Sequence, residues 1–117
     1  MILTSPATSI PELVIGEKPA PLVYQFQDGA GAPLVITGYN AKVNIKEHDA
    51  ASPSISGGAA VVTNGANGEV TYTWTGTEFP TPGQYEIEIW VGNTVQRFCS
   101  VIIQVPVRYA RGPVPAI

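Results

Sequence analysis

The residues of this chain that could do chemistry are few, and the first group is Glu47-His48-Asp49. Their side chains are types that bind metal ions, but neighbours along a strand point to alternate sides, so further ligands would have to come from elsewhere. A calcium site that uses Asp28 and Asp49 stays an alternative, although the spacing of an EF-hand loop is absent. We interpret His48 as a solvated residue at the end of a strand and predict no metal and no cofactor.

Cys99 is the only cysteine, so an internal disulfide is excluded. A catalytic thiol needs an adjacent base that activates it. Cys99 instead lies among valine, phenylalanine and isoleucine residues in the segment Val95–Val105. We therefore predict that Cys99 is buried and packs as a small hydrophobic residue.

Glu86 and Glu88 are two residues apart, so on a strand they share one face with each other and with Trp90. Two carboxylates about 5–9 Å apart are the arrangement of a glycosidase, and an adjacent aromatic ring could line a sugar-binding surface. A solvated outer face of a sheet explains the same pattern more simply. The Gly29-Ala30-Gly31 pattern opens no predicted helix, which argues against a phosphate-binding loop. With no nucleophile beside a base, we predict that the protein is not an enzyme.

The composition favours contact with other proteins. Charged residues make up 13% of the chain, against about 25% in ordinary domains, so much of the surface must be uncharged. The net charge is −3 and the six basic residues are scattered, so we expect no nucleic-acid partner. No apolar run approaches the roughly 20 residues of a membrane span, and the first residues lack the basic start of a signal peptide. We expect no membrane partner and a chain made in the cytoplasm.

The segments that must position these residues are short runs rich in β-branched and aromatic residues, separated by glycines and prolines. Most of them alternate between apolar and polar residues with period two, which indicates half-buried antiparallel strands, and none has the period of a helix. The predicted strands are Leu22–Gln27, Leu34–Ile36, Ala41–Glu47, Ala59–Thr63, Glu69–Thr75, Gln84–Val91 and Val95–Val105. About seven strands with frequent turns predict an all-β fold, an immunoglobulin-like two-sheet antiparallel β-sandwich.

Three residues are assigned structural roles in this sandwich. Tyr85 opens a strand directly after Gly83, at a proline-glycine corner, which is the place of a tyrosine corner. Trp74 is the expected core indole. Trp90, which shares a face with Glu86 and Glu88, is expected to be partly exposed.

The two ends of the chain contain five of its eleven prolines. We therefore divide the chain into an N-terminal arm of residues 1–15, a sandwich domain of residues 16–105 and a C-terminal arm of residues 106–117. Proline lacks the N–H donor of a strand ladder, so the arms are expected to bind other chains. The residues expected to contact partners are Ile2, Leu3, Ile10, Val107, Arg108, Tyr109, Arg111 and Ile117.

The segment Phe26–Glu47 resembles the amino-terminal domain of phage baseplate upper proteins, which is an immunoglobulin-like sandwich. It contains an aromatic strand, a D-x-x-G-x-P turn, an apolar run into Thr-Gly and then an alternating strand. Two later patterns, G-x-V-x-Y and G-x-Y, continue the resemblance, which covers about residues 16–105. The matching positions are Asp28, Gly31, Pro33, Thr37, Gly38, Gly68, Val70, Tyr72, Gly83 and Tyr85.

The resemblance implies a non-enzymatic phage virion protein, a component of the tail, the baseplate or a fibre attachment. Its expected partners are other virion proteins in a symmetric homo- or hetero-oligomeric assembly, and its expected location is the virion, assembled in the host cytoplasm. Two alternatives remain. One is a capsid decoration (cement) protein, and the other is a carbohydrate-binding module that uses Trp90, Glu86 and Glu88.

Overall fold

The computed structural model describes residues 2–4, 10–17 and 19–116, and for residues 2–4 it describes the backbone alone. Nearly all regular structure in these ranges is strand, so the all-β prediction is confirmed. The elements are β1 (Ile2–Thr4), β2 (Leu13–Val14), β3 (Leu22–Gln25), β4 (Asn40–Glu47), β5 (Ile55–Asn64), the 3-10 turn η1 (Gly65–Asn67), β6 (Glu69–Tyr72), β7 (Gly83–Gly92), β8 (Arg97–Cys99) and β9 (Ile103–Arg108).

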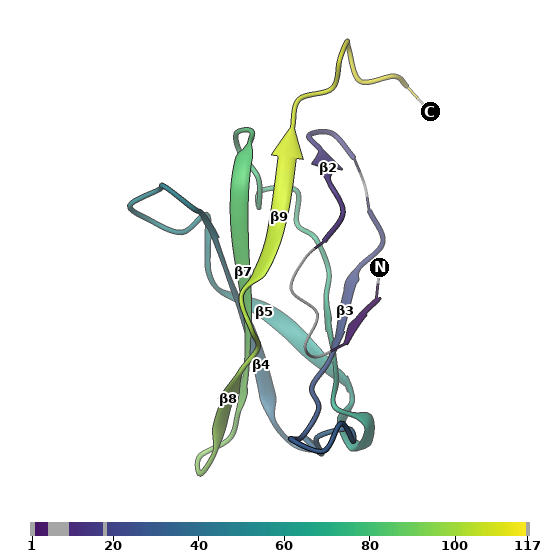
Figure 1. Ribbon diagram of the computed structural model, residues 1–117, viewed down its shortest axis with the longest axis vertical. Helices are drawn as coiled ribbons and strands as arrows, with labels where there is room; N and C mark the ends of the chain where they lie inside the picture. The colour runs from purple at the N-terminus through teal and green to yellow at the C-terminus, as the bar shows by residue number, and fades with distance from the viewer. Residues whose placement is uncertain (1, 5–9, 18, 117) are drawn as a thin grey trace.

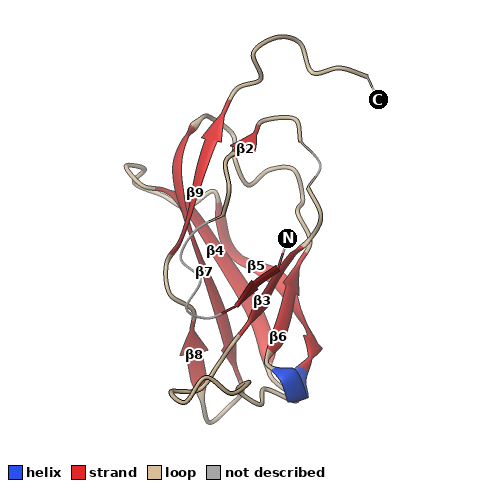
Figure 2. Cartoon of the chain, turned by 45° about the vertical axis from the view of Figure 1, so that its right-hand side comes forward, coloured by secondary structure: helices blue, strands red, loops and turns tan. Residues whose placement is uncertain are grey.

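These strands form one continuous sheet that curls into a half-barrel (Figures 1 and 2). Their order across the sheet is β1-β3-β6-β5-β4-β7-β9-β2, and β8 also pairs with β7. The two outermost pairs, β1 with β3 and β2 with β9, are parallel, whereas the inner pairs are antiparallel. The sheet is therefore mixed, and its curl brings side chains of its inner face together in one core.

The prediction of two separate sheets is corrected, because β5 belongs to both halves of the structure. Its first part pairs with β4 and its second part, from Val61, pairs with β6. The strand was predicted to begin at Ala59, but it begins at Ile55, and the two glycines within Ile55–Gly58 weaken the strand signal there. The register of β4 with β5 shifts within this stretch, and such irregularities bend a strand. One long, bent strand thus joins what would otherwise be two sheets.

The core follows the period-two pattern of the central strands. On β7 every second residue from Tyr85 to Val91 is buried, and on β4 the same holds from Ala41 to Ile45. Ile36, expected on a short strand, is also fully buried, but the segment Leu34–Ile36 is a loop. The buried apolar residues are Ile10, Leu13, Leu22, Tyr24, Phe26, Ile36, Ala41, Val43, Ile45, Val70, Tyr72, Tyr85, Ile87, Ile89, Val91, Ile103, Val105 and Val107.

The prediction that Cys99 is buried is wrong, because a bulge interrupts the expected strand Val95–Val105. Trp90 pairs with Cys99, whereas Ile87 pairs with Ile103, so one extra residue lies on the β8–β9 side. A slip of one residue exchanges the two faces of a strand. Cys99 therefore lies exposed on the outer face, while Ser100 is buried at the bulge and its hydroxyl accepts a hydrogen bond from the Ile89 N–H at 2.9 Å.

Both expected arms contribute strands to the sheet of the domain. β2 (Leu13–Val14) lies in the expected N-terminal arm, and β9 (Ile103–Arg108) extends into the expected C-terminal arm. The Ile10 N–H donates to the Gln104 carbonyl, and β2 continues along β9. Ile10 and Val107 are both buried in the domain's own core, so their assignment as partner-binding residues is corrected. For Val107 the reason is that Pro106 does not end the strand. β9 continues through it to Arg108, and every second residue from Ile103 to Val107 is buried. Ile117 lies outside the described residues, and so do the side chains of Ile2 and Leu3.

Tyr85 has the geometry of a tyrosine corner. Its ring is buried, and its hydroxyl donates to the Thr81 carbonyl at 2.7 Å, four residues upstream. The corner is tight, because a Cβ added at Gly83, whose φ is +154°, would lie 3.2 Å from the Glu47 side chain. Trp74 is only partly buried, packs against the core and donates its indole N–H to the Ala20 carbonyl at 2.9 Å.

Glu78 is a carboxylate that is only 2% exposed, and its burial was not predicted from the sequence. It accepts hydrogen bonds from the Tyr72 hydroxyl at 2.7 Å, from the Thr75 N–H at 2.6 Å and from the Gly76 N–H at 2.9 Å. Burial alone would raise the pKa of Glu78, but hydrogen bonds from Thr75 and Tyr72 outweigh burial and hold the pKa below its ordinary value. The charged carboxylate therefore fastens the loop after β6 to the core.

We expect Tyr85→Phe to lower the free energy of unfolding by about 1–2 kcal/mol, because the Thr81 carbonyl loses its donor. Chemical denaturation measures this loss. Tyr109→Phe is the matched control, since Tyr109 is exposed, and it should change stability by only a few tenths of a kcal/mol. Equal effects of the two substitutions would remove the tyrosine-corner role.

We expect Glu78→Gln to destabilise the fold by about 2 kcal/mol at neutral pH, because the amide cannot accept all the hydrogen bonds of the carboxylate. Since the pKa of Glu78 is lowered by folding, its charge stabilises the fold above the unfolded carboxyl pKa of about 4.3. This contribution is lost as the pH falls through the folded pKa. Denaturation from pH 7 to pH 3 should therefore show the difference between the two proteins shrinking, and a difference that is constant with pH would contradict the assignment.

Candidate interaction surfaces

The chain leaves the sheet at Arg108. The Arg108 guanidinium donates to Glu12 at 2.7 Å, a contact that ties the end of β9 to the segment before β2. Arg108, expected to contact a partner, is thus engaged within its own domain. The expected arm reduces to residues 109–116, which we call the C-terminal tail.

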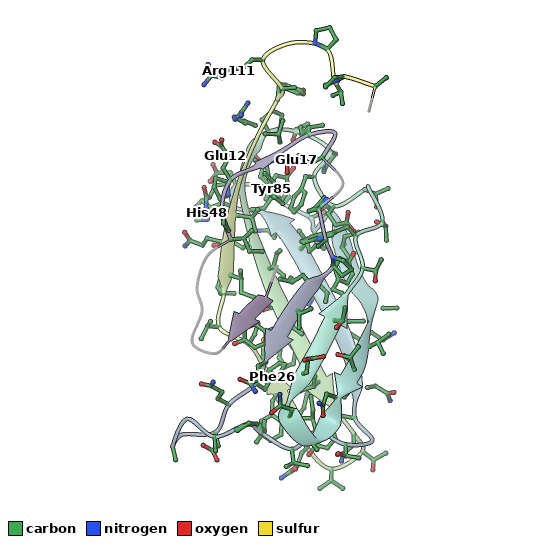
Figure 3. All side chains as sticks on the ribbon, turned by 90° about the vertical axis from the view of Figure 1, so that its right-hand side faces the viewer. Glu12, Glu17, Phe26, His48, Tyr85 and Arg111 are labelled. Atoms are coloured by element: carbon green, nitrogen blue, oxygen red, sulfur yellow. The ribbon has the colours of Figure 1, made fainter. Side chains whose placement is uncertain are left out.

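The C-terminal tail projects past the end of β9 (Figure 1). Among the described residues, no backbone hydrogen bond joins the tail to the domain. Tyr109 and Val114 are 62% and 58% exposed, and Val114 lies against Gly16 in the turn after β2. Arg111 stands above the sheet in Figure 3 and makes no ion pair with a described residue. The tail therefore presents apolar and basic side chains with little support from its own domain.

The outer face of β4, β7 and β8 carries a polar network around Glu88. One Glu88 oxygen accepts hydrogen bonds from the Trp90 indole N–H and the Asn44 amide, both at 2.9 Å, and the Asn44 carbonyl oxygen accepts from the Gly57 N–H. The hydrogen bonds from Trp90 and then Asn44 lower the pKa of Glu88. Trp90 is partly buried, and its N–H is already used. The network holds Glu88 charged and in a fixed position.

A groove crosses this face beside Glu88, and we call it the Ile102 groove. Its volume is about 290 Å³, and its lining residues are Asn44, Lys46, Pro53, Ser56, Glu86, Ile87, Glu88 and Ile102. Ile102 is 46% exposed because it lies in the bulge between β8 and β9. The groove thus combines two carboxylates with apolar side chains. Sequence reasoning found the carboxylates but missed Ile102 and Pro53.

A second, wider depression adjoins the groove on the outer face, with a volume of about 730 Å³. Lys42 and Arg97 line it together with Trp90. The candidate sugar-binding residues are neighbours on this face, because Trp90 donates its indole N–H to Glu88; Trp90 lines the depression, and Glu86 and Glu88 line the adjoining Ile102 groove.

The candidate metal and thiol residues also lie on or beside this outer face. His48 is exposed, with one ring nitrogen 3.3 Å from Glu86 and the other 4.0 Å from Asp49. Within the described residues, no three histidine, cysteine, aspartate or glutamate side chains are placed so that they could hold a metal ion. Partial burial and the neighbouring Glu88 raise the pKa of Cys99 to about 11, so its thiol stays protonated and is a poor nucleophile. No helix in the described ranges has the length and apolarity to cross a membrane.

Comparisons with known proteins bear on the fold. No protein-family model and no curated protein matches this sequence. Among solved structures, the chain is similar to the N-terminal domain of phage TP901-1 ORF48, with a TM-score of 0.54 and 12% sequence identity. The match covers 92% of this chain and 94% of that one. At this identity the similarity shows the fold, so this chain shares its curled all-β architecture with a domain of a phage protein.

Proposed function

We propose that this chain is a non-enzymatic structural protein of a bacteriophage virion, a component of the tail, the baseplate or a fibre attachment. The observation that carries the proposal is the shared fold with the N-terminal domain of a phage protein over nearly the whole of both chains. The resemblance of Phe26–Glu47 to phage baseplate upper proteins supports the same class. Its partners are other virion proteins in a symmetric assembly.

The C-terminal tail is the part of the chain that we assign to docking. Fixing one residue's backbone costs about 1–2 kcal/mol, so an eight-residue tail needs a partner surface if it is to hold one conformation. Its proline residues cannot donate to a strand ladder, which makes surface grooves more suitable partners than sheet edges. Tyr109 and Arg111, both exposed, are the residues that we expect to contact the partner first.

Removing residues 109–117 tests this assignment in particles. We expect the shortened chain to stay folded, because the strands and the buried core lie before residue 109. We also expect it to be lost from assembled particles, as measured by quantitative mass spectrometry of purified virions. The control is Val95→Ala, a change at an exposed residue between β7 and β8 that lies outside the tail and should incorporate normally.

Normal incorporation of the shortened chain would contradict docking through the tail. The same measurement gives the copy number per particle, which distinguishes the proposal from capsid decoration. A tail or baseplate component has few copies, whereas a decoration protein approaches the copy number of the capsid protein.

The carbohydrate-binding alternative makes a different prediction about Trp90. Its ring is partly buried and its indole N–H is already donated to Glu88, so we expect no binding to cell-wall polysaccharides on a glycan array. Binding by the unmodified protein that Trp90→Ala abolishes, with an unchanged melting temperature, would favour the carbohydrate-binding module.

A further inference from the structure

We propose that the Ile102 groove receives the C-terminal tail of a second copy of this chain. The inference rests on the proposed function, in which the tail docks on a virion protein, and it names that protein as another copy of the same chain. The observations that carry it are the complementary charge and apolar character of the tail and the groove.

The tail has the composition of a segment that binds in grooves in extended form. Pro113 and Pro115 fix two of its backbone angles near the polyproline II conformation, so less conformational freedom is lost on binding. Val114 stands between them, and Arg111 precedes Pro113 by two residues. Proline-rich segments of this kind bind grooves that offer apolar walls, and a nearby arginine can pair with carboxylates.

The Ile102 groove offers both features. Ile102 and Pro53 supply apolar surface, and Glu86 and Glu88 supply charge. Two hydrogen bonds already hold the Glu88 side chain, so it loses little conformational entropy when a partner binds. Lys46, opposite Glu86 in register, is the one lysine or arginine that lines the groove, so its two carboxylates exceed its basic side chains by one. Glu86 also lies 3.3 Å from the exposed His48 ring.

Arg111 is the basic residue of the C-terminal tail and can pair with these carboxylates. Arg108 is engaged with Glu12, whereas Arg111 is exposed and forms no ion pair with a described residue. In a polyproline II segment the rise is about 3.1 Å per residue, which places Val114 roughly 9 Å from Arg111. A guanidinium that binds between Glu86 and Glu88 would then place Val114 and the flanking prolines along the groove near Ile102.

The groove that a tail occupies belongs to a second copy. In its own chain the tail turns toward the β2 side, where Val114 lies against Gly16, while β7 and β4 lie on the other side of β9 (Figure 1). In Figure 3 Arg111 stands above the domain, apart from His48, whose ring contacts Glu86. The tail of one copy and the groove of the next are different surfaces, so the contact is heterologous. Repeating this contact from copy to copy gives a ring or a filament. Such repetition suits a symmetric virion assembly.

Sedimentation equilibrium of the full chain, with charge-reversal variants, tests the inference. We expect concentration-dependent self-association of the unmodified protein. Arg111→Glu and Glu86→Arg should each weaken it by about tenfold or more, because like charges then face each other. The double variant Arg111→Glu with Glu86→Arg should restore it.

Two further variants separate the groove from general charge effects. Ile102→Ala should weaken association without changing the net charge. Arg97→Glu, the same charge change in the wider depression, should leave association unchanged. Thermal melts of all variants check that each is folded.

A chain that stays monomeric at millimolar concentration would overturn the inference, and so would single variants that associate as the unmodified protein does. These failures are distinguishable from failure of the proposed function. If association fails while removal of the tail still prevents incorporation into particles, the tail docks on a different virion protein. If removal of the tail has no effect on incorporation, docking through the tail is itself wrong.

Discussion

The pairing of β4 with β7 is the interaction on which the rest of the structure depends. The two strands are in register from Asn40 opposite Gly92 to Glu47 opposite Tyr85, and they lie at the centre of the sheet. Because side chains alternate along a strand, this one register buries Ile87 and Ile89 in the core and turns Glu86 and Glu88 outward. The core and the outer face are therefore two consequences of the same pairing, and a change of register would remove both.

Much of this arrangement could be predicted from the sequence, because the period-two signal is strong in the central strands. It identified the inner and outer faces of β4 and β7 and placed Tyr85 at the corner. It failed where the period is interrupted. Three successive apolar residues, Val101 to Ile103, cannot all face the core of a regular strand, and this was the available sign of the bulge that exposes Cys99 and Ile102.

Other features depend on contacts between distant segments, which a single sequence does not display. Ile10 is buried because its segment runs beside β9, and nothing local distinguishes it from the other apolar residues of the N-terminal segment. Glu78 is buried because Tyr72 and Thr75 donate hydrogen bonds to its carboxylate. From sequence alone a charged residue in a loop is expected at the surface. The groove at Ile102 likewise needs Pro53 from the loop between β4 and β5. Local periodicity thus defined the sheet, and tertiary packing defined the candidate site.

Contact of the C-terminal tail with another chain is tested most directly by photo-crosslinking in assembled particles. A benzoylphenylalanine at position 109 replaces the exposed tyrosine, and mass spectrometry identifies the linked peptides. We expect crosslinks to the outer face of another copy, in the peptides that contain Pro53 or Ile102. Crosslinks found only within the same chain, at the turn near Gly16, would contradict it.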